Sequence, residues 1–135
     1  MSQAARVRTC TLLLAMLVLL GPGCAGTVAT SQSLGRTHET TVGPVLVAPD
    51  DRTLYTYDAD GEGVSNCSGL CAIGWPPLLA PDGAQATDGF TVITRTGGDR
   101  QWAHNGKPLY LYIRDSKPGD VTGDGVDEVW HAARP

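Results

Sequence analysis

The stretch LYTYDAD at residues 54–60 returns as LYLYIRD at residues 109–115. Leu, Tyr, Tyr and Asp stand at the same positions in both copies, separated by 55 residues. The same offset, without a gap, also joins Trp75 to Trp130. Matches this regular predict two copies of one structural unit. Each unit consists of a strand, a tight turn, a YxY strand, a Gly-rich loop and a Trp.

Short apolar runs separated by turn residues fill the chain around these two copies. Alternating side chains at Leu54–Tyr57 and Phe90–Ile93 are typical of β-strands. Asn105-Gly106 indicates a tight hairpin, because both residues tolerate positive φ. We therefore predict an all-β fold of mostly antiparallel hairpins, with at most a short helical turn near the CxxxC segment.

The two repeats are expected to form a single small domain. We place repeat one at residues 43–80 and repeat two at residues 90–135, within a domain that spans residues 43–135. This is about the length of one ordinary domain.

Cys67 and Cys71 lie four positions apart in NCSGLCAIGW. In a helical turn, residues with this spacing are about 6 Å apart at Cα, which is within disulfide range. Thiols outside the cytoplasm oxidise, so we expect a structural disulfide. A metal or redox site is the alternative; zinc would need two further ligands, for which His104 and His131 are the candidates.

The tyrosines of each YxY stretch are two residues apart and point to one face of the strand. They could form an aromatic surface for a sugar or peptide, but we favour rings packed across a sheet. The aspartate that follows is expected to accept backbone N–H bonds from the next loop. The motif residues are Tyr55, Tyr57 and Asp60 in repeat one, and Tyr110, Tyr112 and Asp115 in repeat two.

An acidic loop in repeat two takes the place of the cysteine loop in repeat one. Asp120, Thr122 and Asp124 match three ligand positions of an EF-hand calcium loop. His131, however, stands where the bidentate Glu should be. We therefore expect an acidic turn rather than a calcium site, and we predict no cofactor.

The N-terminal segment has the pattern of an export signal. The apolar block Leu12–Leu20 follows a basic start and leads to GPGC at residues 21–24, which is similar to a bacterial lipobox. We predict a signal peptide at residues 1–23, lipidation of Cys24 and a flexible Ser/Thr-rich tether at residues 24–42. The alternative is an ordinary secreted protein with a spare thiol.

Charge and motif content exclude several classes of function. The formal net charge is −4, and removing residues 1–23 leaves 8 Lys and Arg against 14 Asp and Glu, or −6. An acidic protein of this kind is not expected to bind nucleic acid. The sequence has no nucleophile elbow, P-loop, dinucleotide fingerprint or HExxH motif, so we do not expect an enzyme.

Both quoted stretches fit the pattern Yx(F/W/Y)xxD. With this motif and the NCxGxCAxxWPPL segment, the chain resembles a bacterial family of predicted lipoproteins, also described as a secreted repeat of unknown function. The resemblance covers residues 43–135 and implies an architecture and an export route, but it supplies no catalytic residues.

These observations lead to one expected function and one alternative. We expect a protein anchored by lipid to the extracytoplasmic face of the cell membrane, where it acts as a non-enzymatic binding module for an envelope partner. The alternative is a redox or metal-handling accessory protein that uses Cys67 and Cys71.

Overall fold

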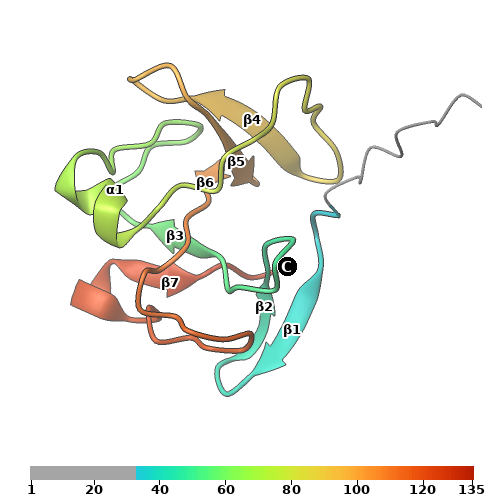
Figure 1. The fold of residues 1–135 in the computed structure, drawn as a ribbon, viewed down its shortest axis with the longest axis vertical. Coiled ribbons are helices and arrows are strands. Elements are labelled where there is room, and N and C mark those ends of the chain that lie inside the picture. The colour runs from blue at the N-terminus through green and yellow to red at the C-terminus, as the bar shows by residue number, and fades with distance from the viewer. Residues whose placement is uncertain (1–32) are drawn as a thin grey trace, which may run out of the picture. The chain divides into compact units, whose positions relative to one another are not determined.

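The computed structural model describes residues 33–135 (Figure 1). The predicted signal peptide and Cys24 lie outside the described residues, as do residues 25–32 of the predicted tether. The part that is described contains no helix long and apolar enough to cross a membrane. Its elements, in chain order, are β1 (Thr37–Thr40), β2 (Gly43–Leu46), β3 (Tyr55–Tyr57), α1 (Leu70–Gly74), β4 (Phe90–Thr94), β5 (Arg100–His104), β6 (Lys107–Pro108), the 3₁₀ turn η1 (Val126–Glu128) and β7 (Trp130–Ala132).

All paired strands are antiparallel, which confirms the predicted fold class. β1 pairs with β2, β3 pairs with β7, and β4, β5 and β6 form a three-stranded sheet in that order. The short helix α1 begins between the two cysteines, close to where a helical turn was predicted. The β3–β7 pair joins the first repeat to the last strand of the second, so the repeats are interleaved.

The hairpin predicted at Asn105-Gly106 joins β5 to β6. Both residues have positive φ, 48° for Asn105 and 80° for Gly106, as a tight two-residue turn requires. The polypeptide therefore reverses direction here, and β6 returns beside β5.

The second YxY stretch differs from the prediction, because it is extended but forms no regular strand. Tyr110 makes only isolated bridges, to Tyr55 and to Pro77. The reason is that successive residues bond to different segments, so no ladder continues. The N–H donors and carbonyl acceptors are Leu109 to Trp102, Tyr110 to Tyr55 and Leu111 to Pro76.

The predicted tether, residues 24–42, extends too far toward the C-terminus. Residues 37–40 form β1, which pairs with β2 from Thr37↔Leu46 to Thr40↔Gly43. Threonine-rich segments suit a strand as well as a linker, because the β-branched side chain fits a pleated surface. The Thr40 hydroxyl also closes the turn by donating to the Gly43 carbonyl at 2.7 Å. The prediction of a tether is therefore wrong for this segment.

Two hydrophobic cores lie on opposite sides of the central extended segments. Leu54 and Leu109 belong to one core, whereas their neighbours Tyr55 and Tyr110 belong to the other. This division follows from the two-residue side-chain period of an extended backbone. The leucine core contains Leu46, Ala48, Leu54, Leu78, Ala80, Phe90, Trp102, Leu109, Leu111 and Ala133. The aromatic core contains Val45, Val47, Tyr55, Cys67, Trp75, Tyr110, Tyr112, Trp130 and Ala132.

Equivalent residues of the two repeats meet at the centre of the domain. Tyr55 N–H donates to the Tyr110 carbonyl at 2.8 Å, and Tyr110 N–H donates to the Tyr55 carbonyl at 2.9 Å. Because these residues occupy the same position in their repeats, the exchange defines an approximate two-fold axis between them. The pairs that flank this axis follow it too, since Leu78 N–H donates to Leu109 as Ala133 N–H donates to Leu54.

Candidate functional site

The first tyrosine of each motif bonds to the aspartate of the other repeat. The Tyr55 hydroxyl donates to Asp115 Oδ2 at 2.6 Å, and the Tyr110 hydroxyl donates to Asp60 Oδ2 at 2.7 Å. The two bonds are related by the approximate two-fold axis. The motif residues therefore join the repeats to each other.

The second oxygen of each aspartate closes a loop in its own repeat. Asp60 Oδ1 accepts the Asn66 N–H at 2.7 Å. Asp115 Oδ1 accepts both the N–H and the hydroxyl of Thr122, at 3.1 and 2.5 Å. The backbone bonds expected from sequence are thus present in both repeats.

Burial determines what these motif side chains can do. Tyr55 and Tyr110 are each 0% exposed, so they offer no aromatic surface to a sugar or peptide. Burial is the main cause that raises the pKa of both phenols above the ordinary tyrosine value. Burial also raises the pKa of Asp60, against the bonds it accepts. The tyrosines therefore remain protonated donors inside the fold.

Four aromatic rings form a continuous stack through the aromatic core. Ring centroids are 4.3, 3.8 and 4.0 Å apart along the stack, with interplanar angles of 12°, 3° and 20°. The stack obeys the same two-fold axis, because its two halves come from equivalent positions. The rings follow the order Tyr57, Trp130, Trp75 and Tyr112.

Cys67 and Cys71 form a disulfide beside this core, with sulfur atoms 2.02 Å apart and Cα atoms 5.3 Å apart. Cys67 is fully buried, whereas Cys71 is partly exposed on α1. The 55-residue offset puts Thr122 and Val126 at these positions in repeat two. Among residues 33–135, no group of three His, Cys, Asp or Glu could hold a metal ion.

The three residues that matched a calcium loop are bonded to different groups of the protein. Asp120 accepts bonds from the Ser116 and Lys117 N–H groups and pairs with the Lys117 ammonium. These contacts hold the pKa of the Asp120 carboxyl below its usual range, and the hydrogen bond from the Lys117 side chain has the largest effect. Asp124 Oδ1 accepts the Ala132 N–H at 2.8 Å. Thr122 bonds to the motif aspartate Asp115, so each of the three has its own protein partner.

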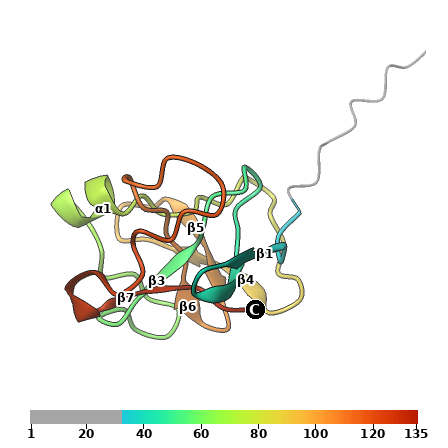
Figure 2. The ribbon, with the colours of Figure 1, turned by 90° about the horizontal axis from the view of Figure 1, so that it is seen from below.

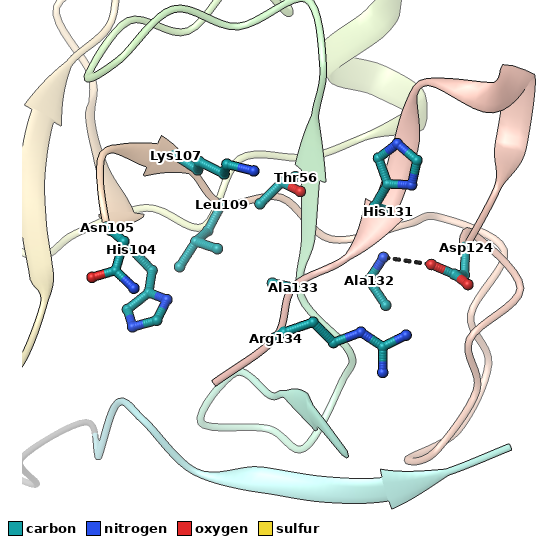
Figure 3. A pocket seen from close by; sticks show the side chains of 10 residues that line it. All are labelled: Thr56, His104, Asn105, Lys107, Leu109, Asp124, His131, Ala132, Ala133 and Arg134. Atoms are coloured by element: carbon teal, nitrogen blue, oxygen red, sulfur yellow. Dashed lines mark hydrogen bonds between the residues drawn. The ribbon is translucent and has the colours of Figure 1, made fainter. Parts of the chain in front are cut away.

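A polar hollow of about 460 Å³ opens between the β3–β7 pair and the β5–β6 hairpin. Figure 3 shows His104, Asn105 and Lys107 on one side of it, His131 and Arg134 on the other, and Thr56 in between. We call it the basic pocket; it is lined by Thr56, His104, Asn105, Lys107, Leu109, Asp124, His131, Ala132, Ala133 and Arg134.

A second hollow of about 440 Å³ adjoins the basic pocket. The two share Thr56, Asn105 and Lys107, so they form one groove. The second half, the acidic pocket, carries three carboxylates, those of Asp58, Asp60 and Glu62. His131 Nε2 lies 2.9 Å from Asp58 Oδ2, and this contact links the charged groups of the two halves.

Sequence reasoning did not find this groove. It considered His104 and His131 as possible zinc ligands, and it did not single out Lys107 or Arg134. His104 and Lys107 lie in the β5–β6 hairpin, and His131 and Arg134 lie at the C-terminal end of the chain, and no local spacing relates the two segments. Only the approach of β7 to the β5–β6 hairpin brings them to one hollow. In the second view, β7 and β6 both lie below β3 (Figure 2).

Comparison with known proteins identifies a family. A family model described as a secreted repeat of unknown function matches the chain twice, at residues 36–79 and 91–134. The first match includes β1, in agreement with the structure. No curated protein and no solved structure matches the chain.

Proposed function

The chain belongs to the family of secreted repeats of unknown function, and from this premise we propose that it is a lipid-anchored, non-enzymatic binding module of the cell envelope. Membership of a secreted family supports a location outside the cytoplasm. The GPGC segment at residues 21–24 supports an anchor on Cys24, which would hold the domain at the extracytoplasmic face of the membrane.

The observation that carries the binding role is the groove formed by the basic and acidic pockets. Each half has the size of a small-molecule site, and polar side chains from both repeats line it. The motif tyrosines, by contrast, are buried and engaged with aspartates. The motif therefore builds the scaffold, and the groove is the surface left for a ligand.

Two measurements test this function separately. Cys24→Ser should move the protein from the membrane fraction to the soluble fraction, because the net charge of the domain is negative and does not attract it to anionic lipid. Unchanged partition into detergent would refute the anchor. For binding, full-length protein cross-linked in native membranes should retain a partner, and a groove variant, Thr56→Trp, should lose it. Equal retention by both proteins would refute the groove as the binding surface.

One observation favours a redox role as the second candidate. Cys71 is partly exposed and lies on α1. Two other residues of this helix, Leu70 and Ile73, are 86% and 63% exposed, so a partner thiol could approach Cys71. A working redox pair should have a reduction potential of about −120 to −270 mV, whereas a structural disulfide should lie below about −300 mV. Equilibration with glutathione and thioredoxin buffers decides between the two.

A further inference from the structure

We propose that the basic pocket binds an oxyanion, a carboxylate or a phosphate group, carried by a ligand whose remaining part is neutral or cationic. This inference rests on the proposed binding function and names the chemistry of its ligand.

The first step is the local reversal of charge. The domain from residue 33 onward carries 14 Asp and Glu against 8 Lys and Arg, yet the basic pocket gathers two cations and two imidazoles around one carboxylate. The carboxylate is that of Asp124, and the cations are Lys107 and Arg134. The surface of the domain is acidic overall and repels anions. The basic pocket is a place on this surface that attracts them. The attraction rests on the two cations, because His131 is paired with Asp58 and burial lowers the pKa of His104.

The second step is that the two cations are available. Within residues 33–135, neither Lys107 nor Arg134 forms an ion pair. The bonds from Arg134 to the Val42 and Pro44 carbonyls both come from Nη1. These bonds orient the guanidinium and leave Nη2 and Nε, which can donate in parallel to two oxygens of one anion.

The third step is that the pocket's own carboxylate is already engaged. Asp124 Oδ1 accepts the Ala132 N–H at 2.8 Å, on β7. It makes no ion pair with Lys107 or Arg134. A ligand oxyanion therefore does not have to displace an internal salt bridge.

The adjoining acidic pocket limits the rest of the ligand. Asp58, Asp60 and Glu62 line it, and they would repel a second negative charge. A neutral or cationic portion can extend there past Thr56 and Lys107, which both halves share. The groove thus favours a ligand with negative charge at one end only.

The test uses full-length protein in detergent and three probes of similar size. Glycerol 3-phosphate carries a phosphate, glycerate carries a carboxylate, and glycerol is the neutral control, all at equal ionic strength. We expect saturable NMR shifts of Lys107, His131 and Arg134 resonances with at least one anion and none with glycerol. The anion that binds more tightly identifies the source of the oxyanion.

Matched variants make the test decisive. Lys107→Gln should weaken the binding of the preferred anion about tenfold or more, because a hydrogen bond to a charged group is lost. Arg114→Gln removes the same charge from an exposed residue that does not line the groove and should change nothing. Absence of a saturable response to both anions, an equal response to glycerol, or unchanged affinity in Lys107→Gln would overturn the oxyanion site.

The outcome is separable from failure of the binding function. If neither anion binds but the wild-type protein still retains its membrane partner in the cross-linking assay, only the inference about the ligand fails. If the wild-type protein retains no partner, the binding function fails as well.

Discussion

Substituting Tyr55→Phe removes one hydroxyl group from the centre of the domain and leaves the ring in place. The Tyr55 side chain is 0% exposed and its hydroxyl donates to Asp115 Oδ2 at 2.6 Å. The Tyr55 hydroxyl oxygen also accepts the Gly123 N–H at 3.3 Å. The substitution therefore leaves a buried carboxylate oxygen and a backbone N–H without their partner.

The expected cost follows from the charge on the acceptor. A hydrogen bond to an ionised group is worth about 1.5 to 3 kcal/mol, and Asp115 is only 8% exposed, so water replaces the lost donor poorly. A loss of ~2 kcal/mol lowers the melting temperature of a domain of this size by about 8 to 16 °C. Chemical denaturation measures the loss of free energy of unfolding, and calorimetry measures the fall in melting temperature.

Tyr57→Phe is the matched control, because it makes the same chemical change two residues away. Tyr57 stacks on Trp130 with centroids 4.3 Å apart, and a phenylalanine ring preserves that contact. Its stability should change by less than about 0.5 kcal/mol. We call the Tyr55–Asp115 and Tyr110–Asp60 hydrogen bonds the crossed bonds, because each joins one repeat to the other. If Tyr55→Phe costs no more stability than this control, the crossed bonds do not hold the repeats together.

Three further predictions concern pH, the disulfide and the aromatic stack. Burial raises the pKa of the two hydrogen-bonded tyrosines, so the folded state keeps protons that the unfolded chain releases above about pH 10. The stability that these protons contribute is therefore present below that pH and lost above it; in an absorbance titration, Tyr55 and Tyr110 should ionise only on unfolding. Cys67→Ser with Cys71→Ser should cost about 2 kcal/mol, because a five-residue loop constrains the unfolded chain little, and the β-type circular dichroism should persist; loss of the fold would contradict this. Trp130→Ala should cost about 3 to 5 kcal/mol, because Trp130 is 3% exposed and packs against Trp75 at 3.8 Å; a loss below ~1 kcal/mol would argue against the stack.

Features encoded by neighbouring residues could be predicted from the sequence. The Asn105-Gly106 hairpin depends on the φ preferences of two adjacent residues. The bond from Asn66 N–H to Asp60 Oδ1, six positions earlier, stays within one loop, and aspartate side chains in turns often bond to nearby backbone N–H groups. Such interactions can be predicted because their partners lie close together in the chain.

The groove and the crossed bonds could not be predicted, because their partners are far apart in sequence. Tyr55 and Asp115 are 60 positions apart, and nothing in either segment specifies the other. Arg134 and Lys107 become neighbours of one pocket only through the pairing of β7 with β3.

The first strand was missed although a signal for it existed. The 55-residue offset, carried farther upstream, places Thr37 on Val92, inside the strand predicted at Phe90–Ile93. The Ser/Thr-rich composition of the segment outweighed this correspondence. A repeat is therefore better evidence for a strand than composition is for a linker, because equivalent positions adopt equivalent structures.

The structure also gives a physical reason for each position of the motif Yx(F/W/Y)xxD. The first position needs tyrosine, because its hydroxyl must reach the aspartate of the other repeat. The second aromatic position needs only a ring, since Tyr57 and Tyr112 each stack on a tryptophan of the other repeat and, within residues 33–135, neither hydroxyl donates a hydrogen bond. Phenylalanine or tryptophan could serve there equally well. The last position needs a carboxylate, because one oxygen accepts the crossed bond and the other closes the loop that follows. Every motif side chain thus depends on the second repeat or on its own loop, so a single repeat would lack the partners for its own motif, and the pair of repeats is the unit that folds.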